Sequence, residues 1–264
     1  MPLQIASPSA PLFCKPCLEA ERDDEAWFGQ EVQILETPEE GWHRVRMEYG
    51  YESYLEARHL AEMPAGDTTG MVCTPWADVL TAPCVKAGIL MTVPKGSRVR
   101  QLAAEDGWAK LALPQGKTGY IKTAHLVPLP APASGQRESF LRGRIVESAL
   151  SYLGAPYRWG GRTPAGLDCS GLCHAAFLLQ GIAIYRNARL EPGWPVQEIP
   201  RARIRAGDLL YFPGHIALYL GGGRYVHASA SAGQVLINSL REGDGDYRPD
   251  LAGSILCTGS IFPL

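Results

Sequence analysis

The chain has 264 residues, with 25 basic and 27 acidic side chains and a formal net charge of −2. This balance gives no electrostatic drive toward nucleic acid or anionic membranes, and no apolar run reaches membrane-spanning length. Seven cysteines cannot all pair, and no even disulfide framework stands out, so we expect a reducing compartment. The first residues lack a basic stretch followed by a hydrophobic one, so we expect no secretory signal and a cytoplasmic location.

Residues 1–65 and 66–130 each predict a small all-β module, because the same short motifs recur in the same order. Each stretch has a Gly-x-x-Val, a Gly-Trp strand start, a Gly-Tyr strand start and a closing His-Leu. The paired positions are Gly29 and Gly96, Gly41-Trp42 and Gly107-Trp108, Gly50-Tyr51 and Gly119-Tyr120, and His59-Leu60 and His125-Leu126. A repeat of about sixty residues indicates two copies of one module. Modules this small bury little surface, so we expect them to dock on each other or on the rest of the chain.

Cys14 and Cys17 have the spacing of a redox motif or of half a zinc site. No second Cys or His pair lies at a matching distance, so an ordinary strand end is the favoured interpretation. We therefore expect no metal and no cofactor.

The prolines at 128, 130 and 132 indicate a stiff linker, which we assign to residues 131–137. From residue 138 the pattern predicts a helix that runs to Leu153 and ends at Gly154. A second, shorter helix follows Asp168, and residues 186–204 form mostly loop. Strands are then predicted at Leu209–Phe212, His215–Leu220, Tyr225–Ala228, Gln234–Asn238 and Ser254–Cys257. Helices first and an antiparallel sheet after them predict an α+β domain over residues 138–264.

Cys169 lies where a reactive thiol is expected. Asp168 occupies the N-cap position of the second helix, so Cys169 falls in its first turn. The unpaired N–H groups and the dipole at a helix start favour a thiolate and lower the thiol pKa. The alternative is an ordinary buried helix residue, as we expect for Cys173 one turn on.

A nucleophilic cysteine needs a base, and two downstream histidines are candidates. His215 begins a strand and could take the thiol proton, while His227 could orient its ring as the third member of a triad. A simple hairpin closed by Gly221–Arg224 makes these two side chains face opposite ways. A bulge at the glycines would bring them into phase. His174, inside the second helix, is expected to be structural.

Five motifs together resemble the NlpC/P60 cysteine peptidases. They are Tyr157-Arg-Trp-Gly-Gly, Leu167-Asp-Cys-Ser-Gly-Leu, Gly207-Asp-Leu-Leu-Tyr-Phe, Gly214-His-Ile-Ala-Leu-Tyr-Leu-Gly and Val226-His-Ala-Ser. The resemblance covers about residues 138–264 and implies a papain-like α+β fold that cleaves bacterial cell-wall peptides. It implies Cys169 as nucleophile, His215 as base and His227 as orienting residue. It further implies an oxyanion hole made by the Tyr157 hydroxyl and the Cys169 N–H, with Asp168 and Ser170 lining the substrate pocket.

The two β-modules resemble bacterial SH3 (SH3b) domains. Two such modules ahead of this domain resemble the γ-D-glutamyl-L-diamino acid endopeptidases of murein peptide recycling, whose SH3b module helps hold a substrate ammonium. Glu52, flanked by Tyr51 and Tyr54, is the candidate for that contact here, and a solvated loop acid is an equal alternative. The family's Arg-Asp-Ser becomes Arg186, Asn187 and Ala188. Asn187 brings no charge, so a strict requirement for a free substrate amine stays open.

The sequence thus predicts a cysteine endopeptidase that cuts the γ-D-Glu–diamino acid bond of murein-derived peptides. The expected partner is that peptide, with the SH3b modules docked on the catalytic domain and no nucleic acid or membrane involved. One alternative is a secreted hydrolase of intact peptidoglycan. Another is a non-catalytic wall-peptide-binding protein. The preferred diamino acid, the module that lines the groove and the oligomeric state are left open.

Overall fold

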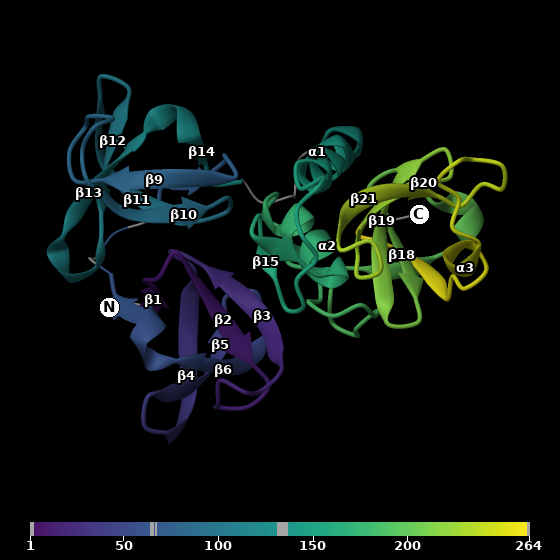
Figure 1. Cartoon of the computed structure of the whole chain (residues 1–264), viewed down its shortest axis with the longest axis horizontal. Helices are drawn as coiled ribbons and strands as arrows, with labels where there is room; N and C mark the ends of the chain where they lie inside the picture. The colour runs from purple at the N-terminus through teal and green to yellow at the C-terminus, as the bar shows by residue number, and fades with distance from the viewer. Residues whose placement is uncertain (1–2, 64–65, 67, 131–136, 263–264) are drawn as a thin grey trace. The chain divides into compact units, whose positions relative to one another are not determined.

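The computed structural model describes residues 3–63, 66, 68–130 and 137–262. The chain divides into two compact units, Met1–Leu129 and Pro130–Leu264 (Figure 1). The predicted linker at 131–137 lies almost wholly outside the described residues. Each unit is built around its own sheets, and the candidate site belongs to the second unit.

The first unit contains two antiparallel sheets with equivalent strand orders. The first sheet runs β3 (Arg22–Trp27), β2 (Ser9–Phe13), β6 (Glu52–Glu56), β5 (Trp42–Met47), β4 (Glu31–Glu39), β1 (Leu3–Ile5) and β7 (Leu60–Glu62). The second runs β10 (Ile89–Pro94), β9 (Trp76–Leu80), β13 (Thr118–Lys122), β12 (Trp108–Ala112), β11 (Arg98–Glu105), β8 (Gly70–Val72) and β14 (Leu126–Pro128). The shared order confirms the predicted duplication. Both sheets are open, with β3 and β7 or β10 and β14 at the edges, so the expected barrels are not closed.

The two modules pack against each other. Phe28 of the first module is buried in the core of the second, and its carbonyl accepts from the Arg98 N–H at 2.8 Å. The paired glycines explain the close approach. A Cβ added to Gly29 would lie 2.1 Å from the Arg98 carbonyl oxygen, and one added to Gly96 would lie 2.3 Å from the Trp27 ring. Both glycines have positive φ, +78° and +90°, which side-chain-bearing residues rarely adopt.

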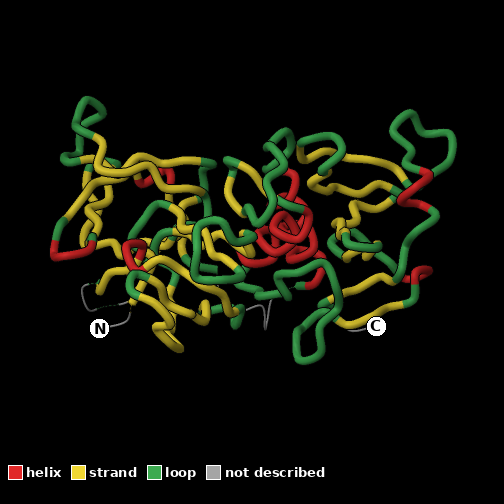
Figure 2. The backbone as a smooth tube through the Cα atoms, turned by 60° about the horizontal axis from the view of Figure 1, so that its bottom comes forward, coloured by secondary structure: helices red, strands yellow, loops and turns green. Residues whose placement is uncertain are grey.

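The second unit is an α+β domain, as predicted. Its antiparallel sheet runs β17 (Gln197–Ile199), β22 (Cys257–Ser260), β18 (Leu209–Phe212), β19 (His215–Gly221), β20 (Arg224–Ser229) and β21 (Gln234–Ser239). The helices are α1 (Glu138–Leu150), α2 (Cys169–Leu178) and α3 (Pro249–Ala252), and a short ladder joins β15 (Arg162–Thr163) to β16 (Gly166–Leu167). Every residue of α2 is buried, and α2 packs on α1, β19 and β20. Figure 2 shows helical coils gathered beside the strands, and Figure 1 shows that α3 lies apart from α1 and α2.

Some predicted boundaries were wrong. The first helix ends at Leu150 rather than Leu153, and β17 lies inside the stretch predicted as loop. The last strand begins at Cys257, where the prediction ended it. In the apolar run before it, Ile255 lies against the core around Leu210, whereas Leu256 is exposed. Among the helices that the structure describes, none is long and apolar enough to cross a membrane.

Candidate active site

Asp168 fixes the start of α2, and with it the position of Cys169. Its backbone is extended, and its Oδ1 accepts the Gly171 N–H at 2.5 Å, so the predicted N-cap is confirmed. Its Oδ2 accepts the Gly160 N–H at 2.8 Å. The carboxylate therefore ties the glycine-rich loop to the helix start.

Arg186 joins the same network from the long loop before β17. Its two terminal nitrogens each donate to one oxygen of Asp168, both at 3.0 Å, and Nη1 also donates to the Ser170 hydroxyl at 2.8 Å. The Arg186 side chain is 1% exposed, so this bidentate guanidinium–carboxylate pair is almost fully shielded from water. The contacts hold Asp168, Ser170 and Arg186 to one another. A role of these three residues in substrate binding stays a prediction.

The Cys169 thiol is buried at this helix start. Burial raises the pKa of the Cys169 thiol to about 11, and the Asp168 carboxylate adds to the rise. The backbone N–H groups of Ile216 and Ser170 lower the pKa by less. The predicted depression of the thiol pKa is therefore wrong, because desolvation outweighs the helix end. The Ile216 contact also brings the sulfur beside the residue that follows His215.

His215, His227 and Asn238 form a chain of side-chain contacts across three neighbouring strands, β19, β20 and β21 (Figure 1). His215 Nε2 lies 2.8 Å from His227 Nδ1. His227 Nε2 lies 2.9 Å from Asn238 Oδ1. His227 and Asn238 are 1% and 6% exposed, so the chain of contacts is shielded from water.

A bulge brings the two histidines into phase. Leu218 pairs with Val226 and Tyr219 with Tyr225, but Gly221 then pairs with Arg224. Leu220 is the extra residue in β19. The shift moves His227 from opposite Leu218 to the next position along, which shares the face of His215. The bulge that the sequence required for this pairing is present.

Both imidazoles are held neutral by burial. Desolvation lowers the pKa of His215 to about 4, and the neighbouring His227 is the next cause. Burial also lowers the pKa of His227, while its hydrogen bond to Asn238 acts the other way. Near pH 7 the site therefore holds a neutral thiol beside two neutral rings. These shifts favour a protonated thiol and neutral imidazoles over a thiolate–imidazolium pair.

Tyr157 lies next to the same thiol. Its N–H donates to the Gly233 carbonyl at 2.8 Å, and its backbone bridges to Leu167, one residue before Asp168. Burial raises the pKa of the Tyr157 hydroxyl to about 12, and the charges that Cys169 and Asp168 would carry add to the rise. The hydroxyl therefore keeps its proton at neutral pH and can donate a hydrogen bond.

Asn187 belongs to a separate polar cluster on the long loop. Its amide donates to the Tyr185 hydroxyl at 3.5 Å, and Arg189 donates to the same hydroxyl at 3.0 Å. Arg189 also pairs with Glu191 at 2.8 Å. Asn187 directly follows Arg186 in the sequence, and Arg186 anchors this loop to Asp168 at the start of α2. Its predicted role at the substrate amine stays a prediction.

Glu52 lies in the first unit and is already paired. Arg46 and Arg44 contact its two carboxylate oxygens at 2.6 and 2.9 Å. The hydrogen bond from Arg46 is the main cause that lowers the pKa of Glu52. A substrate ammonium would have to share this carboxylate with two guanidinium groups. Tyr51 is half-buried beside it.

The contact between Asn238 and His227 was not found from the sequence. Asn238 contacts His227, yet an asparagine at a strand end is typical of a turn. His174 is structural, as expected, with Nδ1 2.9 Å from Arg162 Nη1. Over the described ranges no group of three or more His, Cys, Asp or Glu side chains could hold a metal ion.

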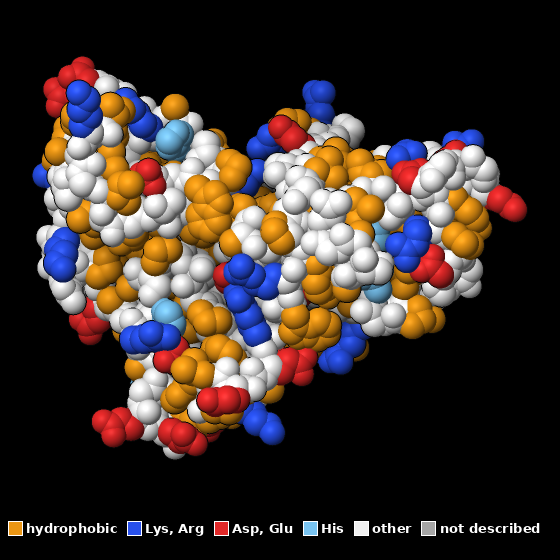
Figure 3. Space-filling model, in the orientation of Figure 1, with side chains coloured by type: hydrophobic (Ala, Val, Ile, Leu, Met, Phe, Trp, Pro, Cys, Tyr) orange, Lys and Arg blue, Asp and Glu red, His pale blue; other side chains and the backbone are white. Residues whose placement is uncertain are grey.

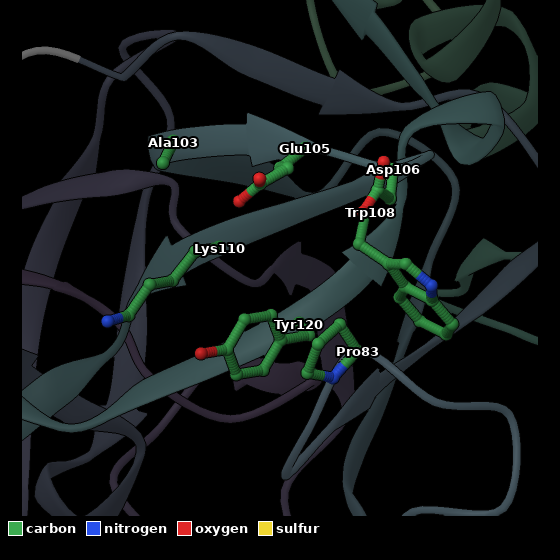
Figure 4. A pocket seen from close by; sticks show the side chains of 7 residues that line it. All are labelled: Pro83, Ala103, Glu105, Asp106, Trp108, Lys110 and Tyr120. Carbon is green, nitrogen blue, oxygen red and sulfur yellow. The ribbon is translucent and has the colours of Figure 1, made fainter.

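The first unit has pockets of its own. One, of about 340 Å³, is lined in the second module by Pro83, Ala103, Glu105, Asp106, Trp108, Lys110 and Tyr120 (Figure 4). It contains none of the candidate site residues, although Trp108 and Tyr120 belong to the repeated Gly-Trp and Gly-Tyr motifs. On the face shown in Figure 3, side chains of both charges are interspersed with hydrophobic ones, in keeping with the balanced composition.

Comparisons with known proteins agree with this geometry. The model of the NlpC/P60 family matches residues 154–248, and that of a bacterial dipeptidyl-peptidase SH3 domain matches residues 12–60. The chain is 40% identical to dipeptidyl-peptidase 6 of Lysinibacillus sphaericus, over 96% of this chain and 97% of that protein. It is 30% identical to a γ-D-glutamyl-L-lysine dipeptidyl-peptidase of Bacillus subtilis, over 53% of this chain and 48% of that one.

The fold also matches that of a solved structure. A crystal structure of an NlpC/P60 family protein from Bacillus cereus covers 100% of both chains with a TM-score of 0.81, at 19% identity. Likeness at that identity bears on the fold alone, whereas the relative from Lysinibacillus sphaericus matches nearly end to end. The chain is therefore a cysteine peptidase that belongs to the NlpC/P60 family.

Proposed function

We propose that this peptidase hydrolyses the bond between γ-D-glutamate and the diamino acid of short murein-derived peptides, such as L-Ala-γ-D-Glu-L-Lys or its diaminopimelate counterpart. The name of the Bacillus subtilis relative, a γ-D-glutamyl-L-lysine dipeptidyl-peptidase, supports hydrolysis at this bond. The single observation that carries the mechanism is the 2.8 Å contact between His215 Nε2 and His227 Nδ1 beside the Cys169 helix start. That contact leaves Nδ1 of His215 for the thiol.

In the first step, the Cys169 sulfur attacks the γ-carbonyl carbon of D-glutamate as the thiol proton moves to His215 Nδ1. The tetrahedral intermediate carries a negative oxygen, to which the Tyr157 hydroxyl and the Cys169 N–H donate. Collapse of the intermediate breaks the C–N bond, and the leaving amine takes the proton from His215. Water then attacks the thioester, His215 accepts a proton from it, and release of the carboxylic acid restores the thiol.

We further propose that the enzyme acts on released peptides in the cytoplasm, as part of murein recycling. Seven unpaired cysteines, three of them exposed (Cys14, Cys17 and Cys84), support a reducing compartment. Fractionation of cells that express the natural gene tests the location. Recovery of the enzyme outside the cytoplasm would favour the alternative of a wall-remodelling enzyme.

The test of the proposed reaction is mass spectrometry of the products from L-Ala-γ-D-Glu-L-Lys and L-Ala-γ-D-Glu-diaminopimelate. We expect L-Ala-D-Glu and the free diamino acid, and no products with Cys169→Ser. An N-acetylated peptide shows whether the substrate amine is needed in a site that has Asn187 instead of Asp. Release of fragments from intact sacculi, with the small peptides left uncut, would overturn the proposal.

A further inference from the structure

Asn238 completes a diagonal row of side chains on one face of the sheet. The register of β20 and β21 pairs Tyr225 with Asn238 and His227 with Leu236. Asn238 is therefore the diagonal neighbour of His227, close enough for side chains to meet. It contacts His227 at 2.9 Å, and His227 contacts His215 at 2.8 Å.

A backbone carbonyl fixes which way the Asn238 amide points. The Asn238 nitrogen Nδ2 donates to the Asp246 carbonyl oxygen at 2.9 Å. A carbonyl can only accept, so the amide nitrogen must face Asp246 and the amide oxygen must face His227. That oxygen can only accept as well. The ring nitrogen Nε2 of His227 therefore carries the proton in this contact.

The proton positions of both rings follow in sequence. A neutral imidazole has one N–H, so with Nε2 of His227 protonated its Nδ1 is an acceptor. The facing atom, Nε2 of His215, must then donate. Nδ1 of His215 is left with a lone pair, which is what a base for the Cys169 thiol requires.

We propose that Asn238 is a positioning residue that sets the tautomers of His227 and, through it, of His215. This inference rests on the proposed function, in which His215 takes the thiol proton. Asn238 acts through two rings and touches neither sulfur nor substrate. In each turnover one proton moves from the thiol to Nδ1 of His215 and on to the leaving amine, while the protons on both Nε2 atoms stay in place.

The surroundings leave the choice of tautomer to hydrogen bonding. Arg248 and Asp250 act on both rings with opposite signs, from before and within α3. The ring centroids of Phe212 and His215 lie 5.7 Å apart, and those of Tyr225 and His227 lie 5.1 Å apart. Cys169 approaches from α2. The aromatic rings of Phe212 and Tyr225 do not select which imidazole nitrogen is protonated. The hydrogen bond to the Asn238 amide does.

A merely structural role for Asn238 has to be separated from this one, because its amide also anchors the loop that follows β21. Ser239 offers a matched control. It is fully buried, its hydroxyl donates to Asp244 at 2.6 Å, and it accepts the Arg241 N–H at 3.0 Å. Ser239→Ala therefore weakens the same loop without touching either histidine.

The kinetic test compares Asn238→Leu, Asn238→Asp and Ser239→Ala in the full chain. We expect Asn238→Leu to lower kcat roughly 100-fold with KM nearly unchanged, as expected for a wrong tautomer, and Ser239→Ala to lower it by less than about threefold. Asn238→Asp places a carboxylate against His227, so the acid limb of kcat/KM should move to higher pH. Equal losses in Asn238→Leu and Ser239→Ala, with no shift of the acid limb in Asn238→Asp, would make Asn238 a loop anchor only.

A second measurement needs no substrate. Long-range ¹H–¹⁵N NMR correlations of ¹⁵N-histidine-labelled protein report the tautomer of each ring, and single histidine substitutions assign His215 and His227 among the six histidines. We expect Nε2–H on both rings, and a changed pattern in Asn238→Leu. A proton on Nδ1 of His227 in the unmodified protein would overturn the inference. Failure to cut the murein peptides would instead count against the proposed function and leave the tautomers as measured.

Discussion

At the scale of single residues, two opposing effects meet at the Cys169 thiol. The helix start supplies N–H groups that favour a thiolate, but the residue is 8% exposed and loses more from desolvation than it gains from those groups. His215 is shifted the other way by the same burial. Both shifts favour the protonated thiol over the thiolate.

The first prediction concerns alkylation of this thiol. Because burial raises its pKa to about 11, the rate of Cys169 modification by iodoacetamide should keep rising from pH 6 to pH 10. The rate is measured by mass spectrometry of the Cys169 peptide. A rate independent of pH over that range would indicate a preformed thiolate and contradict the prediction.

The second prediction concerns the catalytic side chains. Cys169→Ala and His215→Ala should each reduce peptide hydrolysis by roughly 1000-fold or more, and His227→Ala by less, since an orienting residue usually contributes less than the nucleophile and base. Cys173→Ala, one turn on and also buried, is the control and should keep its activity. Circular dichroism should show the same fold in all variants. Undiminished turnover by Cys169→Ala would refute the mechanism.

At the scale of elements, the start of α2 is held by one carboxylate. Asp168 caps the helix, binds the glycine-rich loop through Gly160 and forms a nearly dry pair with Arg186. A buried pair of this kind is costly to break from one side, because the remaining charge loses its partner. The network therefore holds the nucleophile's backbone in place.

The third prediction follows from that pair. Asp168→Asn keeps an oxygen for the helix cap but removes the negative charge beside Arg186, so we expect a loss of about 3–5 kcal/mol in the free energy of unfolding. Urea denaturation measures it. Asp250→Asn, which breaks the more exposed pair with Arg248, is the control and should lose no more than about 1 kcal/mol. Similar losses in the two variants would show that the buried pair contributes little.

The close packing of the two β-modules also depends on single turns between strands. Gly96 and Gly107 both have positive φ, +90° and +78°. A Cβ at Gly96 would meet the Trp27 ring at 2.3 Å, whereas nothing lies within 4 Å of one at Gly107. The two glycines therefore share a backbone requirement and differ in their neighbours.

The fourth prediction uses this difference. Gly107→Ala should cost about 1 kcal/mol of stability from its backbone alone. Gly96→Ala should cost roughly a further 1–3 kcal/mol, because Trp27 must move. Thermal unfolding followed by tryptophan fluorescence compares the two variants. Equal destabilisation would mean that Trp27 moves aside without penalty.

At the scale of the whole molecule, stability should depend on pH through the buried histidines. Burial lowers the pKa of His215 and of His227 in the folded chain, while both titrate near 6.5 when unfolded. Below pH 6.5 the unfolded chain therefore binds protons that the folded chain does not. The free energy of unfolding must fall as the pH falls.

The fifth prediction gives the range. The contribution of His215 should be fully present above about pH 6.5 and decline down to its folded pKa of about 4. Urea midpoints measured between pH 7.5 and 4.5 test this, and His215→Gln should show a shallower decline than the unmodified chain. Identical slopes in the two proteins would contradict it.

Much of the architecture could be predicted from local patterns. The repeated Gly-Trp and Gly-Tyr motifs indicated two related β-modules, and Asp168 marked the helix start, because turns and caps depend on residues near in sequence. Strand limits were predicted less accurately, and the last strand begins at Cys257, where the prediction ended it. In the run that ends at Cys257, Ile255 packs on the core while Leu256 is exposed, a difference that periodicity does not reveal.

The sequence by itself determined that a cysteine opens a capped helix and that two histidines follow on strands, since these depend on residue type and short spacing. Only the tertiary structure decided their chemistry. Packing on α2 buried Cys169 and raised its pKa, the bulge at Leu220 turned His227 toward His215, and β21 brought Asn238 to that pair. Burial and register both depend on segments distant in the chain, so no local pattern could have fixed them.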